Sequence, residues 1–205
     1  MEKKETNINT KEYWNDRFFF ENKSRDEMLD IFNRIDGWEG DILDFAPFLK
    51  ELNKKNEKMK ILDVGGGIGA ASERARKIYL NGDFYSLDIS ESAYKICSEL
   101  FPEIKPVLST MEKIPFNDEY FDIIFCIQAI EHCDNIEKTI FEIFRVLKHH
   151  GIFMLSFPYN WPADADHTYR LDDFFVNLFL KYGKILEYKE SENQYNSKVL
   201  KIFKD

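Results

Sequence analysis

The segment of greatest chemical interest is a glycine run that directly follows a short apolar stretch. Residues 61–64 (ILDV) lead into four glycines at positions 65, 66, 67 and 69, and a helical pattern begins at Ala70. Glycine permits unusual backbone angles and lets a ligand approach the main chain closely. The first N–H groups of the following helix can bind that ligand. The pattern therefore predicts a strand, a ligand-binding turn and a helix, because a plain strand–helix turn seldom needs four glycines.

Two kinds of ligand are compatible with this turn. Residues 65–70 satisfy the dinucleotide fingerprint G-x-G-x-x-G/A, with Asp88 about 20 residues further on for a ribose hydroxyl. A second pattern, D-x-G-x-G-x-G, comprises Asp63, Gly65, Gly67 and Gly69. In that pattern the acid before the glycines can face an ammonium group on a ligand without pyrophosphate. A dehydrogenase has no reason to require this acid, so later residues must decide between the two.

A second carboxylate follows the next apolar run. Asp88 stands at the carboxyl end of residues 84–87, where it can accept hydrogen bonds from both hydroxyls of a ribose. Its alternative role is to cap the helical segment that starts near Ser90. Either ligand is compatible with an acid at this place.

Four further segments resemble motifs that occur together in one enzyme family. They are residues 12–17 (EYWNDR), 109–116 (STMEKIPF), 121–124 (FDII) and 145–151 (RVLKHHG). Family counterparts read E-Y-W-D-x-R, D-A-E-x-L-P-F, F-D-x-V and R-V-L-K-P-G-G. With the glycine run, and in this order, they resemble the small, single-domain class I S-adenosylmethionine-dependent methyltransferases. The resemblance covers about residues 12–160, and it implies methyl transfer with S-adenosylmethionine as cofactor.

The resemblance also implies which residues bind the cofactor. Thr110 stands where family members have an Asp that binds the adenine amine, so we expect Met111 to pack on adenine and Glu112 to supply the missing acceptor. Gln128, directly after the fourth apolar run, should border the methionine part. The predicted cofactor-binding residues are Asp63, Gly65, Gly67, Gly69, Asp88, Ile89, Met111, Glu112 and Gln128.

The acceptor side is expected on the loops that follow the fourth and fifth apolar runs. Methyl transfer from a sulfonium requires an aligned acceptor, and a base helps only where the acceptor must lose a proton. His132 matches an E-H pattern of the family, and His167 lies in an aromatic loop that resembles an acceptor loop. We predict both as catalytic; a hydrogen-bonded structural role is the alternative for His132. The predicted substrate-binding residues are Tyr13, Tyr159, Trp161 and Tyr169.

Two further groups have more than one interpretation. Trp14, Phe18 and Phe19 form an aromatic helical stripe that suits either a lid over the cofactor or the core. The acids near His167 match no standard metal-ligand spacing, so no metal site is expected.

Short apolar runs alternate with amphipathic helices along most of the chain. The runs are residues 61–64, 84–87, 106–108, 123–127, 152–157, 185–188 and 198–203. The helical stretches are residues 70–80, 91–100, 136–147 and 171–182. Such alternation predicts an α/β fold with a doubly wound, mostly parallel seven-stranded sheet. The last two runs lack a helix between them, so they should pair antiparallel at one edge.

The chain is expected to fold as one compact unit. Residues 1–58 are predicted to form an N-terminal helical cap or lid. Residues 59–205 are predicted to form the Rossmann-like domain that binds S-adenosylmethionine.

Composition narrows the classes of partner. The 37 acidic and 28 basic side chains give a net charge of −9, which argues against nucleic acid and anionic membranes as partners. The longest apolar run, residues 123–127, is far shorter than the roughly 20 residues of a membrane span. No signal peptide is visible at the N-terminus. Three cysteines without a C-x-x-C motif indicate reduced thiols, so we expect a cytoplasmic protein whose oligomeric state stays open.

The sequence thus predicts S-adenosylmethionine-dependent methyl transfer to a hydroxyl or amine of a small-molecule acceptor. Three alternatives stay open: a non-catalytic cofactor-binding partner subunit, a nicotinamide-dependent oxidoreductase, and a methyltransferase that acts on a macromolecule. Ligand binding discriminates between the two cofactors, and turnover discriminates between an enzyme and a silent subunit.

Overall fold

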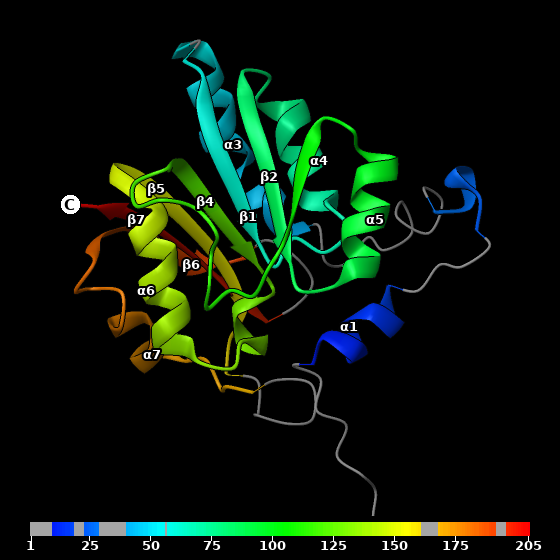
Figure 1. Cartoon of the computed structure of the whole chain (residues 1–205). Coiled ribbons are helices and arrows are strands. Elements are labelled where there is room, and N and C mark those ends of the chain that lie inside the picture. The colour runs from blue at the N-terminus through cyan, green and yellow to red at the C-terminus, as the bar shows by residue number, and fades with distance from the viewer. Residues whose placement is uncertain (1–9, 19–22, 29–39, 56, 161–167, 192–195) are drawn as a thin grey trace, which may run out of the picture.

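A seven-stranded sheet forms the centre of the computed structural model, which describes residues 10–18, 23–28, 40–55, 57–160, 168–191 and 196–205 (Figure 1). The strands lie in the order β3-β2-β1-β4-β5-β7-β6. Their bounds are β1 Met59–Val64, β2 Gly82–Asp88, β3 Ile104–Leu108, β4 Phe121–Ile127, β5 Leu147–Pro158, β6 Gly183–Glu190 and β7 Ser197–Lys204. The pairs among β1 to β5 are parallel, whereas β7 is antiparallel to both β5 and β6. The predicted α/β fold with an antiparallel edge is confirmed.

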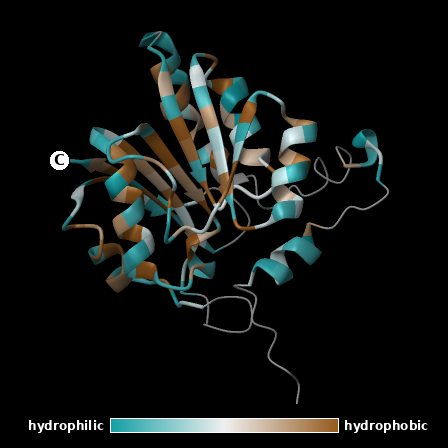
Figure 2. Ribbon diagram, in the orientation of Figure 1, coloured by the Kyte–Doolittle hydropathy of each residue, from teal (hydrophilic) through white to brown (hydrophobic). Residues whose placement is uncertain are grey.

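Helices cover both faces of this sheet. Their bounds are α1 Lys11–Arg17, α3 Gly40–Lys55, α4 Ala70–Ile78, α5 Glu91–Leu100, α6 Ile136–Val146 and α7 Asp173–Asn177, with a 3₁₀ turn, η1, at Ile130–His132. Apolar side chains of α3, α4 and α5 form one buried cluster with the sheet, and those of α6 and α7 form another on the opposite face. Figure 2 shows the central strands as largely hydrophobic between these layers. Parallel strands buried on both faces account for the continuous apolar runs of the sequence.

Two elements differ from the sequence expectation in detail. Strand β7 inserts between β5 and β6, an arrangement that depends on pairing between distant segments. The helix expected over residues 171–182 is α-helical only over Asp173–Asn177, after which Leu178, Phe179 and Leu180 donate to carbonyls three residues earlier. This tighter winding still keeps Phe179 fully buried, so the apolar pattern survives although the α-helix ends.

The first residues of β5 have an unusual backbone. His150 has a φ of +62°, in the left-handed region that favours glycine. The pairing register between β4 and β5 shifts nearby, between Phe121 and Ile123. The start of β5 is therefore irregular.

Parts of the predicted N-terminal cap have different surroundings. In α3, Ile42, Phe45 and Leu49 belong to the same buried cluster as the sheet residues Ile61 and Phe125. In contrast, α1 has no buried residue and lies next to α5, beneath the sheet in Figure 1. The division of the chain at residue 58 stays a prediction, but α1 has the exposure expected of a lid.

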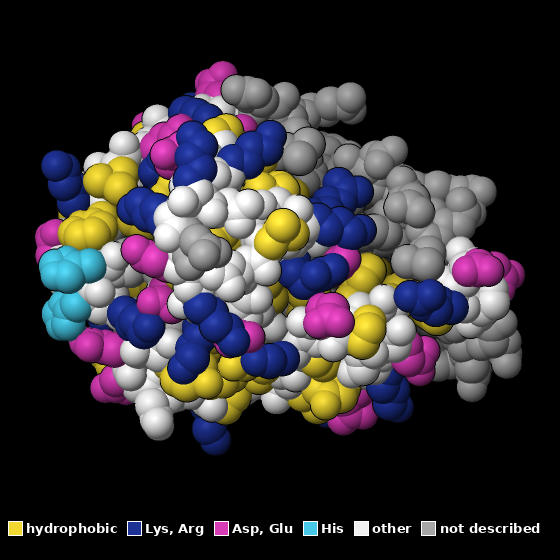
Figure 3. All heavy atoms as spheres, turned by 90° about the horizontal axis from the view of Figure 1, so that it is seen from above, with side chains coloured by type: hydrophobic (Ala, Val, Ile, Leu, Met, Phe, Trp, Pro, Cys, Tyr) yellow, Lys and Arg dark blue, Asp and Glu magenta, His cyan; other side chains and the backbone are white. Residues whose placement is uncertain are grey.

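The end of the molecule where the parallel strands begin has mixed charge. Figure 3 shows lysine and arginine side chains interspersed with acidic ones on this face, and histidine at one edge. His149 and His150 are both exposed, and His149 Nε2 lies 3.0 Å from Glu119 Oε1. The candidate site lies at the opposite end of the strands.

Candidate active site

A cavity of about 180 Å³ opens where β1, β2 and β4 end. In doubly wound sheets, ligands bind outside the carboxyl ends of the strands, as this cavity does. The loops after β1, β2, β3 and β4 all contribute to its wall, together with α1. The sequence-predicted residues that line it are Asp63, Gly65, Gly67, Asp88, Ile89, Met111, Glu112, Gln128 and His132.

The glycine loop has the backbone that only glycine adopts readily. Gly65, Gly67 and Gly69 have φ values of +75°, +53° and +85°. A Cβ on Gly65 would lie 2.5 Å from Ala129 Cβ and 2.8 Å from Met111 Cε. The loop therefore needs glycine both for its backbone angles and for close packing at the end of β4.

Gly69 has a different place from the one predicted. It is the N-cap of α4 and is absent from the cavity wall. A Cβ there would lie 2.5 Å from Cys97 Sγ on α5. Gly69 thus allows α4 to pack closely against α5, and a direct contact with cofactor stays a prediction.

Asp88 lies in the wall at the carboxyl end of β2. Its Oδ2 accepts a hydrogen bond from the Gly67 amide at 2.9 Å, and its Oδ1 accepts one from the Ser90 amide at 2.8 Å. Burial raises the pKa of Asp88, and these amide hydrogen bonds oppose the rise. Because a carboxylate offers about four acceptor positions, capacity remains for ribose hydroxyls. The capping role and the ligand role are therefore compatible.

Asp63 lies beneath the glycine loop and is only 2% exposed. Ser72 Oγ on α4 donates a hydrogen bond to Asp63 Oδ2 at 2.9 Å. Burial raises the pKa of Asp63 to about 7; the Ser72 hydrogen bond opposes this rise, and the nearby Asp88 adds to it. A Cβ on Gly66 would lie 2.9 Å from Asp63 Oδ2. The acid thus supports the loop from below, and its predicted contact with an ammonium group stays a prediction.

The loop after β3 brings two predicted adenine contacts to the cavity. Met111 packs against Gly65, as described above. Glu112 Oε1 accepts hydrogen bonds from the amides of Asp134 and Asn135, at 2.8 and 3.3 Å. Asn135 is the N-cap of α6. Glu112 therefore ties the loop after β3 to the start of α6, a role that the sequence did not indicate, while it also lines the cavity.

Gln128 directly follows β4 with an unusual backbone. Its φ is +47°, and its amide donates to the Ser156 carbonyl at 3.0 Å. The side-chain amide nitrogen donates to Ser197 Oγ at 3.1 Å. A non-glycine residue in the left-handed region marks a position where surrounding structure compels the backbone. Gln128 thus links the cavity wall to β5 and β7.

His132 enters the wall from η1. Its side chain is 12% exposed, and Nε2 lies 3.9 Å from Glu131 Oε1. The indole ring of Trp14, on α1, meets the imidazole edge-on, with ring centroids 5.1 Å apart. Trp14 and Phe18 both line the cavity. Of the two interpretations of the aromatic stripe, these two residues fit the lid.

Comparison with known proteins shows what the central part of the chain is similar to. Residues 62–155 match the family described as "Methyltransferase domain". The ubiquinone/menaquinone biosynthesis C-methyltransferase UbiE of Idiomarina loihiensis is 24% identical over 155 residues, which cover 72% of this chain and 61% of that protein. A sterol 24-C-methyltransferase of Neurospora crassa is 32% identical over 109 residues, covering 50% of this chain and 28% of that protein. A SAM-dependent methyltransferase structure from Aquifex aeolicus has a TM-score of 0.62 at 20% identity, covering 77% of this chain and 89% of that one. The resemblance to class I S-adenosylmethionine-dependent methyltransferases is thus confirmed over residues 62–155, and the chain shares their fold.

Several predicted acceptor-side residues do not line the cavity. Tyr13 packs edge-on against Trp14, and the Tyr169 hydroxyl donates to the Asp134 carbonyl at 2.9 Å. Lys198 Nζ lies 4.9 Å from the centre of the Tyr159 ring. Trp161 and His167 lie outside the described residues. The substrate role of all of these residues, and the catalytic role of His167, stay predictions.

The wall also contains residues that sequence reasoning missed. They include Ile68, Ala71, Ser109, Ile127, Cys133 and Asp134. Most directly follow a strand or flank a predicted residue, so extending each motif by one or two positions would have found them. All three cysteines are buried, and burial raises the pKa of the Cys133 thiol to about 12.

Among the described residues, no group of three histidine, cysteine or acidic side chains is placed to bind a metal. No helix within the same ranges has the length and apolar character of a membrane crossing.

Proposed function

We propose that this chain transfers the methyl group of S-adenosylmethionine to a small-molecule acceptor. One observation carries the proposal. Three groups lie in the wall of one cavity: the carboxylate of Asp88 at the end of β2, the glycine loop at Gly67 after β1, and the imidazole of His132 after β4. Asp88 would hold the ribose, and the loop would allow the cofactor close to the backbone.

The chemical step requires little beyond alignment. The acceptor's electron pair forms the new bond to the methyl carbon, and the carbon–sulfur bond breaks with its electrons on sulfur. The products are neutral at sulfur, so positioning supplies most of the acceleration. Trp14, Phe18 and His132, which lie together in the wall, would form the acceptor side.

His132 is the residue we assign as general base where the acceptor must lose a proton. Among the described histidines it alone lines the cavity, since His149 and His150 lie exposed elsewhere. A hydroxyl or amine acceptor would give its proton to this imidazole. An activated carbon acceptor, as the names of the C-methyltransferase relatives suggest, would use the same base.

Calorimetry with S-adenosylhomocysteine and with NAD tests the cofactor. We expect S-adenosylhomocysteine to bind at micromolar concentration or tighter, and NAD not to bind. Binding of NAD alone would reject methyl transfer. Screening of small hydroxyl, amine and activated-carbon compounds with methyl-labelled S-adenosylmethionine then identifies the acceptor class.

Substitution His132→Ala tests the base. A positioned base contributes about 10²- to 10⁴-fold, so turnover should fall by that factor while S-adenosylhomocysteine binds as before. His149→Ala is the matched control, because His149 is exposed and pairs with Glu119. Turnover of His132→Ala within about threefold of the unmodified chain would exclude His132 as the base and leave an acceptor that needs no deprotonation.

A further inference from the structure

The helix α1 lies over the cofactor cavity without being part of the core. None of its residues is buried, and Figure 2 shows it as mainly hydrophilic. Nevertheless its Trp14 and the following Phe18 line the cavity. A Cβ on Gly67 would lie 3.2 Å from Phe18 Cζ, so the Phe18 ring rests on the glycine loop. The place of α1 therefore depends on the half-buried Trp14 and Phe18 rings and on a few polar contacts.

Asn15 supplies the most direct of these contacts. Its side-chain oxygen Oδ1 accepts a hydrogen bond from Ser90 Oγ at 3.0 Å and one from the Ser92 amide at 3.3 Å. Both donors lie at the start of α5, whose N-cap is Ser90. The ion pair of Lys11 with Glu91 joins the same two helices, but both side chains are exposed, and exposed pairs contribute little.

The contacts of Asn15 lead directly to the predicted ribose site. The Ser90 amide donates to Asp88 Oδ1, while the Ser90 hydroxyl can donate to Asn15 Oδ1 at 3.0 Å or to the Trp14 carbonyl at 3.3 Å. The same helix also contacts His132 through the Trp14 ring. Helix α1 thus connects the wall after β2 with the wall after β4, and Asn15 fixes one end of that connection.

We propose that Asn15 is a positioning residue for cofactor binding. It does not line the cavity; it holds α1 on the start of α5, so that Trp14 and Phe18 complete the wall. Apparent affinity falls in proportion to the fraction of molecules that hold the binding-competent arrangement. Loss of the Asn15 contacts therefore weakens the cofactor complex without removing any cofactor contact. The inference rests on the proposed function, since it takes the cavity as the S-adenosylmethionine site.

The variants Asn15→Ala and Asn15→Asp, made in the full chain, separate this positioning role from an effect on the stability of helix α1 itself. Asparagine and aspartate both favour helix less than alanine, so Asn15→Ala increases the intrinsic helix propensity of α1. Asp16→Ala increases it in the same way, and Asp16 is exposed on the same helix. Weaker cofactor binding in Asn15→Ala but not in Asp16→Ala would then result from loss of the contacts with Ser90 and Ser92. Asn15→Asp retains an oxygen acceptor at the start of α5, where a negative charge is also favourable.

Calorimetric titration with S-adenosylhomocysteine is the measurement. We expect Asn15→Ala to bind about three- to tenfold more weakly, as loss of one or two hydrogen bonds predicts, with an unchanged thermal midpoint. Asn15→Asp should bind within about twofold of the unmodified chain, and Asp16→Ala should be indistinguishable from it. Amide exchange should show that S-adenosylhomocysteine protects residues 11–17 in the unmodified chain and protects them less in Asn15→Ala.

Failure of the inference and failure of the proposed function give different results. If the unmodified chain binds S-adenosylhomocysteine and Asn15→Ala binds equally well, Asn15 is not a positioning residue, and the proposed function stands. Equal weakening in Asn15→Ala and Asn15→Asp would also overturn the inference, because the acceptor oxygen would then be irrelevant. If the unmodified chain does not bind S-adenosylhomocysteine, the proposed function fails and this inference fails with it.

Discussion

Replacement of Asp88 by alanine is the sharpest test of how this protein would hold the proposed cofactor. In the structure the carboxylate accepts the amides of Gly67 and Ser90, at 2.9 and 2.8 Å. If ribose hydroxyls also donate to it, the substitution removes two kinds of interaction at once. One kind contributes to affinity for the cofactor, and the other contributes to folding. The two must therefore be measured separately.

The expected magnitudes follow from those contacts. A hydrogen bond to a charged acceptor contributes about 1.5–3 kcal/mol, and loss of one such bond already weakens binding roughly tenfold or more. With two ribose hydroxyls and some compensation by water, Asp88→Ala should raise the dissociation constant of S-adenosylhomocysteine at least tenfold. The freed amides of Gly67 and Ser90 should also lower the free energy of unfolding by about 1–3 kcal/mol.

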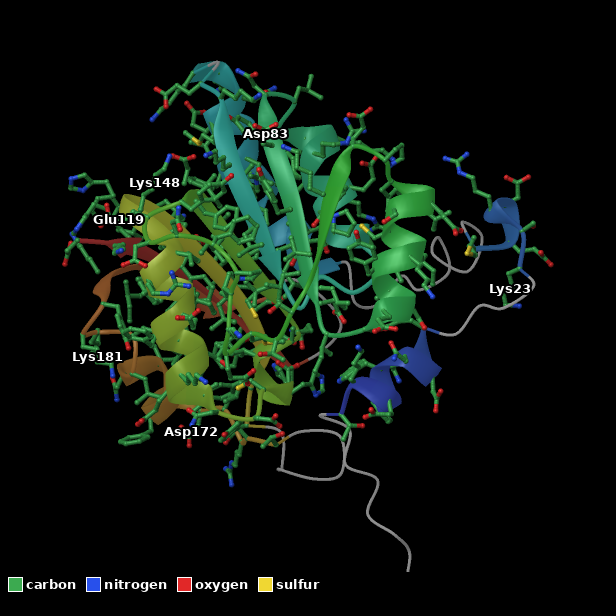
Figure 4. All side chains as sticks on the ribbon, in the orientation of Figure 1. Lys23, Asp83, Glu119, Lys148, Asp172 and Lys181 are labelled. Carbon is green, nitrogen blue, oxygen red and sulfur yellow. The ribbon has the colours of Figure 1, made fainter. Side chains whose placement is uncertain are left out.

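Calorimetry gives the affinity, and urea unfolding without ligand gives the stability. Asp83→Ala is a matched control, because Asp83 lies on the same strand at its other end, away from α1 in Figure 4. It forms ion pairs with Lys58 and Lys105 and has no place in the cavity wall. An Asp88→Ala variant that loses stability but binds S-adenosylhomocysteine within about threefold of the unmodified chain would refute the ribose role and leave only the backbone-capping role.

Two further predictions concern the glycine loop and its support. The raised pKa of Asp63, about 7, means that the folded chain favours its protonated form; this contribution to stability is fully present below about pH 4 and is lost as pH rises through about 7. Urea unfolding should therefore show that the free energy of unfolding of the unmodified chain falls relative to that of Asp63→Asn as the pH rises from 4 to 8. If the free energies of the two proteins change with pH in the same way, burial does not raise the pKa of Asp63. Gly69→Ala should lower the free energy of unfolding by about 1–3 kcal/mol, because φ is +85° and the new Cβ meets Cys97 Sγ. A urea midpoint equal to that of the unmodified chain would contradict this account.

Much of the fold could be predicted because burial on both faces of a parallel sheet produces continuous apolar runs. Each of the seven runs lies within a strand of the structure. The insertion of β7 between β5 and β6 could not be predicted, because local pattern carries no information on which distant segments pair. Similarly, the helix after Asp172 shortens although its apolar spacing continues, since 3₁₀-type turns keep Phe179 facing the core.

Some residues of the candidate site could likewise be predicted from the sequence, and others could not. Asp88, Gly65 and Gly67 could be predicted, because they follow strand ends that must meet at one edge of the sheet. The contact of Glu112 with the start of α6 could not, since it joins residues 22 and 23 positions apart in the chain. The place of Trp14 and Phe18 in the cavity wall could not be predicted for a different reason, because aromatic residues at helical spacing suit a core and a lid equally.

The electrostatics of the cavity bear on the choice between the two cofactors that share this glycine pattern. Asp63 and Asp88 both lie in the wall. Burial is the main cause of the raised pKa of Asp63, and the nearby carboxylate of Asp88 adds to it. Ionisation of both acids is therefore unfavourable unless a positive charge lies nearby. S-adenosylmethionine carries a sulfonium and an ammonium group, which would offset the repulsion. The pyrophosphate of NAD is anionic and would increase it. The two carboxylates thus favour the cationic cofactor at a turn whose glycines alone would accept either.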